Sequence, residues 1–419
     1  MSTLQKTDIL VLGATGFVGR LVVKFLNAHR ERSTFTFTIS ARSKDKLETL
    51  SKELDLNAQV QVLLLDLEDI PSLEKAIKRS KVVINTVGPF WLHGTPVVRL
   101  CAQNGIHYVD ITGEPVWIRK MIDKYDFLAH KTGAIILPSC GYDSIPSDLS
   151  VYLSVKSLKQ KLGQDTQIGK SISVHQHRGG ISFGTFSSVF SHFNDVTPKD
   201  RIAAMNPDYL SPTSRTARIP PRLVYSLPLP NSNRSIYGGI YIMGLTNQLN
   251  VYRTRGLYQI CPSMKSTQYG LKFTYEEFYA TSGRIRAFLL SSVLTIMALW
   301  LHKYAFARKL FKSLVVDRAR GPQPEEMESG FLKLTNITES IPSNRQAKAK
   351  AKSVVRIQGD PGYLCTAECA IALLNPTTLT PLAQEGGLLT PVSALGDVLI
   401  QRLQDTGKFT FESDVISDS

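Results

Sequence analysis

Short apolar runs alternate with helix-patterned stretches along the first 150 residues of the chain. The stretches at Arg20–His29 and Lys44–Leu54 carry apolar residues at helical spacing. The apolar runs between such stretches have the length and β-branched content of buried strands. These runs are Asp8–Leu12, Phe35–Ser40, Val60–Leu65, Val82–Val87 and Ala134–Leu137. Alternation over such short distances predicts a parallel sheet with helices on both of its faces.

The pattern changes after about residue 150. Loops lengthen, proline becomes frequent between Pro198 and Pro230, and strand-like runs occur at Ser171–His177 and Leu249–Arg255. Helical spacing returns at Leu395–Thr406. We therefore expect a second domain of mixed α/β structure, followed by a C-terminal helix and tail.

The segment Ala287–Leu301 contains 15 uncharged residues and is flanked on both sides by basic residues. A helix needs about 20 apolar residues to cross a bilayer, so this segment is short for a span. Its length favours a buried or dimer-interface helix. The alternative is a monotopic helix that lies on a membrane or lipid surface with basic anchors. A transmembrane span is the least favoured of the three.

Composition narrows the class of protein. The chain has 419 residues, 43% of them hydrophobic and 20% charged, which is typical of globular proteins. Its net charge of +14 is spread along the sequence without a nucleic-acid-binding motif, so we expect no nucleic-acid partner. The five cysteines are scattered and lack metal-ligand spacing, which predicts no metal and a reducing compartment. The N-terminus lacks a secretory pattern, so the cytoplasm is expected.

The strongest motif is GATGFVG at Gly13–Gly19, which follows an apolar run and opens a helix. Gly13 permits a tight turn, Gly16 lets backbone approach a pyrophosphate, and Gly19 lets the helix pack against the strand. The N–H groups of a helix N-terminus bind phosphate. The turn therefore predicts a dinucleotide site in a Rossmann domain, and its expected contacts are Gly13, Thr15, Gly16, Phe17, Val18 and Gly19.

The end of the second predicted strand indicates which dinucleotide binds. An NAD site needs an acidic residue there, but this strand runs into Ala41-Arg42-Ser43. Arg42 can pair with a ribose 2′-phosphate, and Ser40 and Ser43 can donate hydrogen bonds to it. The sequence therefore favours NADP(H). Asp66 is expected near the adenine, and Gly88 and Pro89 near the ribose or nicotinamide.

Several longer blocks resemble the saccharopine dehydrogenase-like oxidoreductase family, and most closely its trans-acting enoyl reductase branch. The resemblance covers nearly the whole chain. Besides Gly13–Gly19, it is carried by NTVGPF (Asn85–Phe90), HGTPVVRLCAQNGIHYVDITGE (His93–Glu114), LPSCGYDSIPSDL (Leu137–Leu149), GGISFGT (Gly179–Thr185) and GDPGY (Gly359–Tyr363).

The resemblance implies a fold of class α/β, with an N-terminal Rossmann doubly wound parallel sheet and a C-terminal mixed α/β substrate domain. The expected boundaries are 1–150 for the NADP-binding domain, 151–395 for the closing domain with the apolar helix 287–301, and 396–419 for the C-terminal helix and tail. It also implies NADPH-dependent hydride transfer to a hydrophobic unsaturated enoyl substrate of polyketide or lipid type. Relatives in animals are associated with lipid surfaces.

Two other functions stay open at this point: a ketone or imine reductase of secondary metabolism, and a non-catalytic NADP-binding protein on a lipid surface. A carrier-bound substrate, a peripheral membrane location and a homodimer are also left open. The pattern at Tyr152–Lys156, thirteen residues after Ser139, is similar to that of short-chain dehydrogenases. This pattern is permissive, so that family is the minor alternative.

Candidates for the chemistry lie after the predicted strands. Tyr142 could donate a hydrogen bond to an oxyanion and Asp143 could orient it; alternatively, Asp143 and Ser144 cap the following helix. His93 is a candidate near the nicotinamide, and a structural role is an equal alternative. Tyr108, Asp110 and Glu114 are expected on another loop.

Overall fold

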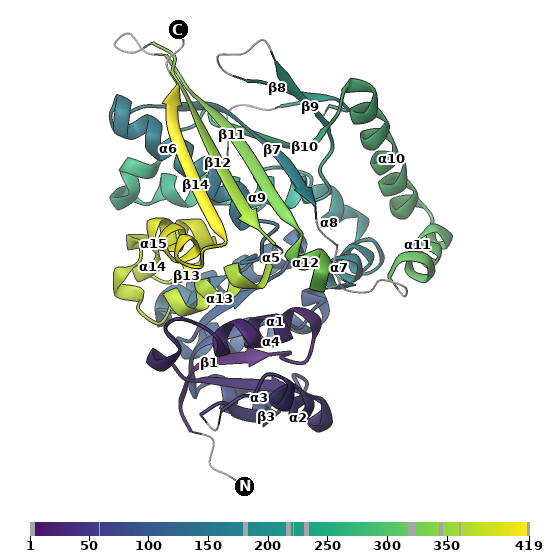
Figure 1. Cartoon of the computed structure of the whole chain (residues 1–419), viewed down its shortest axis with the longest axis vertical. Helices are drawn as coiled ribbons and strands as arrows, with labels where there is room; N and C mark the ends of the chain where they lie inside the picture. The colour runs from purple at the N-terminus through teal and green to yellow at the C-terminus, as the bar shows by residue number, and fades with distance from the viewer. Residues whose placement is uncertain are drawn as a thin grey trace. The chain divides into compact units, whose positions relative to one another are not determined.

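The computed structural model describes residues 5–57, 59–178, 183–214, 219–220, 222–229, 234–316, 324–342, 347–359 and 362–416. The chain forms two compact units (Figure 1). The first unit comprises Met1–Ile145 and Pro361–Leu403, and the second comprises Pro146–Asp360 and Gln404–Ser419. The first unit is thus built from two separate segments of the chain.

The first unit contains a parallel sheet in the order β13-β6-β5-β4-β1-β2-β3. Without β13, this is the strand order of a doubly wound dinucleotide-binding sheet, so the predicted Rossmann fold is confirmed. The strands are β1 (Thr7–Leu12), β2 (Phe37–Ala41), β3 (Gln61–Leu64), β4 (Ser80–Asn85), β5 (His107–Asp110), β6 (Ile135–Leu137) and β13 (Gly387–Leu388).

Helices cover this sheet because they have one apolar face. In α1 the buried residues are Gly19, Val22, Val23 and Leu26, which recur every three or four positions. The sheet strands are apolar on both faces, as expected for a buried parallel sheet. The helices of this unit are α1 (Phe17–Asn27), α2 (Lys44–Glu53), α3 (Ile70–Ile77), α4 (Phe90–Asn104), α5 (Pro115–Thr132), α13 (Gly362–Ala372), α14 (Pro381–Gln384) and α15 (Pro391–Asp405).

The unit boundaries differ from those expected at 1–150, 151–395 and 396–419. Helix α13 packs against α1, β4 and β5, and β13 pairs with β6, so residues 361–403 complete the first unit. The tail beyond α15 is a strand, β14 (Phe409–Ile416), that pairs with β12 in the second unit. These pairings join residues far apart in sequence, which local patterns do not reveal.

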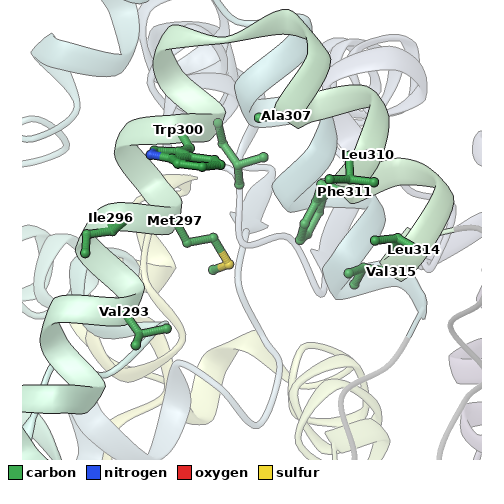
Figure 2. Close-up of a pocket in the computed structure, with 10 residues that line it drawn as sticks. Val293, Ile296, Met297, Trp300, Ala307, Leu310, Phe311, Leu314 and Val315 are labelled. Carbon is green, nitrogen blue, oxygen red and sulfur yellow. The ribbon is translucent and has the colours of Figure 1, made fainter.

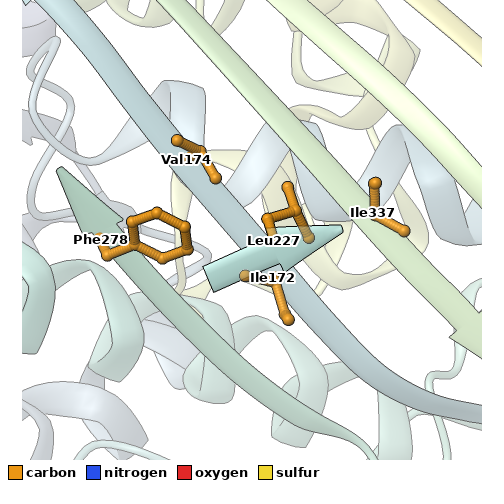
Figure 3. Packing of buried hydrophobic residues seen from close by; sticks show 5 residues of the cluster. All are labelled: Ile172, Val174, Leu227, Phe278 and Ile337. Atoms are coloured by element: carbon orange, nitrogen blue, oxygen red, sulfur yellow. The ribbon is translucent and has the colours of Figure 1, made fainter. Parts of the chain in front are cut away.

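The second unit contains a mixed sheet in the order β14-β12-β11-β7-β10-β9-β8. Only β7 and β10 pair in parallel among these described strands. Ile172, Val174, Leu227, Phe278 and Ile337 form a buried cluster on it (Figure 3). The other strands are β7 (Ile168–Arg178), β8 (Tyr225–Pro228), β9 (Ser235–Gly239), β10 (Thr274–Thr281), β11 (Phe331–Ser340) and β12 (Lys350–Gln358).

Helix α9 corrects one expectation in this unit. The run Leu249–Arg255 is part of a helix and not a strand, and it is buried on all sides. Its polar members have internal partners: Arg253 donates to the Leu210 carbonyl and Arg255 to that of Gly270. The helices of this unit are α6 (Ile145–Leu162), α7 (Phe183–Asn194), α8 (Pro198–Ala203), α9 (Gly244–Ile260), α10 (Arg284–Lys303), α11 (Ala305–Phe311) and α12 (Pro324–Glu328).

A buried carboxylate, Glu277, gathers polar side chains inside the second unit. It accepts hydrogen bonds from Ser147 Oγ (2.8 Å), Tyr275 Oη (2.6 Å) and Asn247 Nδ2 (2.7 Å), and His175 Nε2 lies 3.1 Å from it. Because each oxygen of the carboxylate has a partner, this cluster serves as a polar core of the unit.

The apolar segment Ala287–Leu301 lies within helix α10, Arg284–Lys303. Within the described residues, this is the one helix whose length and composition would suit a membrane span, and only 17% of its most apolar window is buried. The expectation of a buried core helix is therefore wrong, and an exposed helix is compatible with both the dimer-interface and the lipid-surface alternatives. Its residues Ala287, Ser291 and Leu301 face the protein, and most of its large apolar side chains face outward.

Candidate cofactor site and active site

The glycine turn lies between β1 and α1, at the carboxyl edge of the parallel sheet. Gly13 has a φ of +80°, and a Cβ there would lie 2.7 Å from Val87 Cγ2. A Cβ on Gly19 would lie 2.1 Å from the Gly13 carbonyl oxygen. Packing within the protein therefore requires glycine at both positions.

Gly16 has no such internal requirement. Its φ is −71°, and a Cβ would come no nearer than 3.3 Å to other atoms. It precedes α1, and no side chain caps the helix there. Among the described residues, no acceptor is found for four backbone N–H groups at this turn: those of Thr15, Phe17, Val18 and Gly19. Unfilled donors at a helix N-terminus form a site for an anion such as a pyrophosphate.

Arg42 follows β2 directly and is exposed. It makes no hydrogen bond or ion pair with the described part of the chain, so its guanidinium can meet a ligand phosphate. Ser43 caps α2 by accepting from Lys46 N, at 3.4 Å, and its hydroxyl can still donate. Ser40 is buried and donates to the Val11 carbonyl, so it does not reach a phosphate as the sequence suggested. Asp66 is exposed and closes a turn with Glu68 N.

A buried polar network joins the carboxyl ends of β4, β5 and β6. Asn85 Nδ2 donates to Tyr108 Oη (3.2 Å), which donates to Asp110 Oδ2 (2.8 Å). Asp110 Oδ1 also accepts from the N–H groups of Thr112 and Ser139, both at 2.9 Å. Burial raises the pKa of Asp110 to about 7, although these hydrogen bonds favour its charged form. Tyr108 and Asp110, expected on a loop, lie in strand β5.

Glu114 fixes the start of α4, the helix that carries His93. Its buried carboxylate accepts from Phe90 N (3.0 Å) and Trp91 N (2.7 Å), so it caps the helix. His93 lies in the first turn of α4 and is half-buried. Gly88 and Pro89 connect β4 to this turn, and Thr86 Oγ1 in the same connection donates to the Leu12 carbonyl, at 2.8 Å. The connection is thereby tied to the glycine turn.

Tyr142 and Asp143 lie half-buried in the turn between β6 and α6. Ser139, just before them, has a φ of +61° and is held by the Asp110 carboxylate and the Thr112 carbonyl. A non-glycine residue in this conformation costs about 1–3 kcal/mol, and such residues cluster at functional sites. Thr366 of α13 donates to the Cys140 carbonyl, so the second segment of this unit supports the turn.

The predicted cofactor and catalytic residues, apart from Ser40 in β2 and Tyr108 and Asp110 in β5, therefore lie after strands of one parallel sheet, whose carboxyl ends share an edge. Sequence reasoning missed the Asn85–Asp110 network and the capping role of Glu114. The signal was present, because Asn85 and Asp110 are polar residues at the ends of apolar runs. Part of the GGISFGT block lies outside the described residues. Within the described part of the chain, no three His, Cys, Asp or Glu side chains are grouped as metal ligands would be.

The sheet order and the glycine turn define a dinucleotide-binding domain, and the comparison with protein families agrees. Residues 9–137 match the model of the saccharopine dehydrogenase NADP binding domain. The chain binds NADP(H). The fold is similar to that of apo saccharopine dehydrogenase (L-Glu forming) from Saccharomyces cerevisiae, with a TM-score of 0.58 over 98% of this chain and 100% of that one. At 13% identity, that likeness shows the fold alone.

Similarity to other proteins extends over both units. A Mycobacterium tuberculosis protein named as a trans-acting enoyl reductase is 31% identical to this chain, over 97% of each of the two chains. The trans-acting enoyl reductase of Mycobacterium bovis is 30% identical, over 96% of this chain and 97% of that one. A Caenorhabditis elegans lipid droplet localized protein is 25% identical, over 94% and 95%. The chain belongs to the saccharopine dehydrogenase-like oxidoreductase family, in the trans-acting enoyl reductase branch.

Proposed function

We propose that the chain is an NADPH-dependent reductase of a conjugated C=C bond in a hydrophobic enoyl substrate of polyketide or lipid type. The observation that carries the proposal is the extent of the similarity. The relatives named as enoyl reductases align over the second unit as well as over the nucleotide-binding unit. A shared nucleotide-binding domain alone would support only an oxidoreductase.

The cofactor contacts follow from the turn geometry. The free N–H groups between Thr15 and Gly19 would hold the pyrophosphate, and Arg42 with Ser43 would hold the 2′-phosphate. Asp66 would lie near the adenine, and Gly88 and Pro89 near the ribose or nicotinamide. When bound, NADPH supplies a hydride.

Reduction of an enoyl group also needs a stabilised oxyanion and a proton. Tyr142 is our candidate donor to the substrate carbonyl oxygen, with Asp143 beside it in the same turn. The positions of Ser139 and Cys140 are fixed by buried hydrogen bonds, so the Tyr142 turn starts from a rigid base. His93 is the second candidate, because its half-buried imidazole lies in the first turn of α4 and histidine is the commonest general acid or base.

The substrate test compares acceptors at fixed NADPH concentration. We expect NADPH oxidation with α,β-unsaturated thioesters, faster with long chains than with short ones, and none with simple ketones or imines. Tyr142→Phe should lower kcat about 100-fold without changing NADPH binding. Tyr125→Phe, in helix α5, is the matched control. Turnover of ketones or imines alone would replace the proposal by the alternative reductase, and NADPH binding without turnover of any acceptor would favour a non-catalytic protein.

The cofactor test is a titration with NADPH and NADH. Loss of a charged hydrogen bond costs about 1.5–3 kcal/mol, so Arg42→Ala should weaken NADPH binding about 10- to 100-fold and leave NADH binding unchanged. Lys44→Ala removes a neighbouring exposed cation and should change neither affinity. Equal loss for both nucleotides would remove Arg42 from the 2′-phosphate site.

The proposed place of action is a lipid surface. The name of the Caenorhabditis elegans relative supports this location, and so does the exposure of helix α10. A reductase at such a surface would meet a hydrophobic substrate where that substrate is soluble.

A further inference from the structure

Helices α10 and α11 form an apolar projection of the second unit (Figure 1). Five consecutive residues, Ile296–Trp300, are all exposed, among them Leu299 at 60% and Trp300 at 53%. Phe306 and Leu310 of α11 continue this surface and are exposed by 58% and 53%. Large contiguous apolar surfaces mark binding sites for a protein partner or a lipid.

The two ends of α10 differ in how they are held. The N-terminal half is fastened to β9: Ser291 Oγ accepts from Ile240 N at 2.9 Å, and Gly239 leaves room for the Ala287 carbonyl. The C-terminal half contacts α11, and Arg308 donates to the Leu301 carbonyl. Because one half is bound to the sheet, the helix cannot cross a bilayer without breaking that attachment. In the described part of the chain, the C-terminal half of α10, together with α11, is not bound to the sheet and can enter a lipid surface from one side.

Between the two helices lies an apolar cavity of about 410 Å³. Met297 and Trp300 of α10 and Leu310 and Phe311 of α11 point into it, as Figure 2 shows. The turn beside it carries an aromatic cluster, with the Tyr304 and Phe306 ring centroids 5.5 Å apart and Trp300 at 6.4 Å from each. Tryptophan and tyrosine concentrate at the boundary between headgroups and hydrocarbon.

Charge distinguishes a lipid surface from a second copy of the chain. Between Gly283 and Val316 there is no acidic residue, but there are basic ones: Arg284, Arg286, Lys303, Arg308, Lys309 and Lys312. In a symmetric dimer the same surface would meet itself and bring these cations together. An anionic headgroup layer would instead neutralise them.

We propose that the α10–α11 projection inserts from one side into a lipid surface that carries anionic headgroups, with its cations at the headgroups and Leu299, Trp300 and Phe306 below them. This inference rests on the lipid-surface part of the proposed function. Insertion needs neither substrate nor turnover, so its failure and a failure of the reductase activity are distinguishable.

The test is flotation of the full chain with vesicles of phosphatidylcholine, with or without phosphatidylserine. The unaltered chain should float with both and more strongly with phosphatidylserine. The double variant Leu299→Ser with Phe306→Ser should bind at least about 100-fold more weakly to both. Lys303→Gln with Lys309→Gln should lose about 30-fold, on the phosphatidylserine vesicles only.

Matched controls change the same residue types elsewhere: Phe127→Ser with Leu271→Ser, and Lys265→Gln with Lys348→Gln. Their flotation should equal that of the unaltered chain. Absence of flotation with either vesicle, or equal loss in the controls, would overturn the proposal. So would a dimer in sedimentation velocity that Leu299→Ser with Phe306→Ser converts to a monomer, because the surface would then bind a second copy.

Discussion

Helices α13 and α10 both contain long apolar runs, but they have opposite environments. Helix α13 is buried in the first unit, yet it carries a charge at its centre: Glu368 is fully buried between His29 Nε2 (3.1 Å) and Arg402 Nε (2.7 Å). Helix α10 has no acidic residue and is largely exposed. Apolar composition therefore does not indicate burial in this chain. The more informative feature is whether charged residues find partners inside the protein.

The largest effect should follow from removing the charge inside α13. Glu368→Ala leaves His29 and Arg402 without their shared partner, and breaking a buried ion pair costs about 3–5 kcal/mol. Chemical denaturation would measure the free energy of unfolding. Glu368→Gln, which keeps an acceptor, should cost less. If the free energy of unfolding of the alanine variant fell by less than about 1 kcal/mol, the Glu368 carboxylate would not stabilise the packing of α13.

The same substitution at one position in each helix tests the comparison directly. Leu364 of α13 is buried, so Leu364→Ser should cost about 2–5 kcal/mol. The exposed counterpart is Leu299 of α10, where the same substitution should have the smallest effect. Similar costs at the two positions would remove the contrast between the helices.

Asp148 of α6 is a buried carboxyl without a cation, unlike Glu368. Burial raises its pKa to about 8, and a hydrogen bond from Thr254 opposes this only in part. The folded chain then keeps a proton that the unfolded chain releases near pH 4, so stability falls as the pH rises from about 4 to about 8.

Asp148→Asn should make that dependence shallower by at most about 1.4 kcal/mol per pH unit. Part of the pH dependence should remain in this variant up to neutral pH, because burial also raises the pKa of Asp110, to about 7. Thermal unfolding across this range would measure it, with the exposed Asp66→Asn as control. Parallel curves for the Asp148 variant and the unaltered chain would contradict the raised pKa.

The smallest effect is expected at Leu299 of α10. Leu299→Ser should change the free energy of unfolding by less than about 0.5 kcal/mol, because the side chain is exposed in the folded chain. Denaturation in the absence of lipid is the measurement. A cost comparable to that of Leu364→Ser would show that α10 is covered in solution.

The sequence predicted features that local patterns encode. The Gly13–Gly19 turn and the apolar strands around it recur in the structure because each depends on residues within one turn of chain. Strand β5 was missed because it has only four residues and two of them are polar. Residues 249–255 were misassigned because α9 buries polar residues on all sides, which removes the helical period.

Other features depend on contacts that no local pattern contains. The exposure of α10 was not predicted, because its 15 uncharged residues are short for a membrane span and that length favours a buried or dimer-interface helix. The catalytic candidates Tyr142, Asp143 and His93 were found only by their place after strands. The network that supports Ser139 depends on side chains from two strands, β4 and β5.

The pairing of β13 with β6 has a consequence for how the protein is made. The nucleotide-binding unit begins at the N-terminus, but its seventh strand and the α13 covering come from residues 361–403. A growing chain thus releases residues 146–360, which form most of the second unit, before it can complete the first. The nucleotide-binding unit is therefore expected to lack its seventh strand and its α13 covering until most of the chain has been translated.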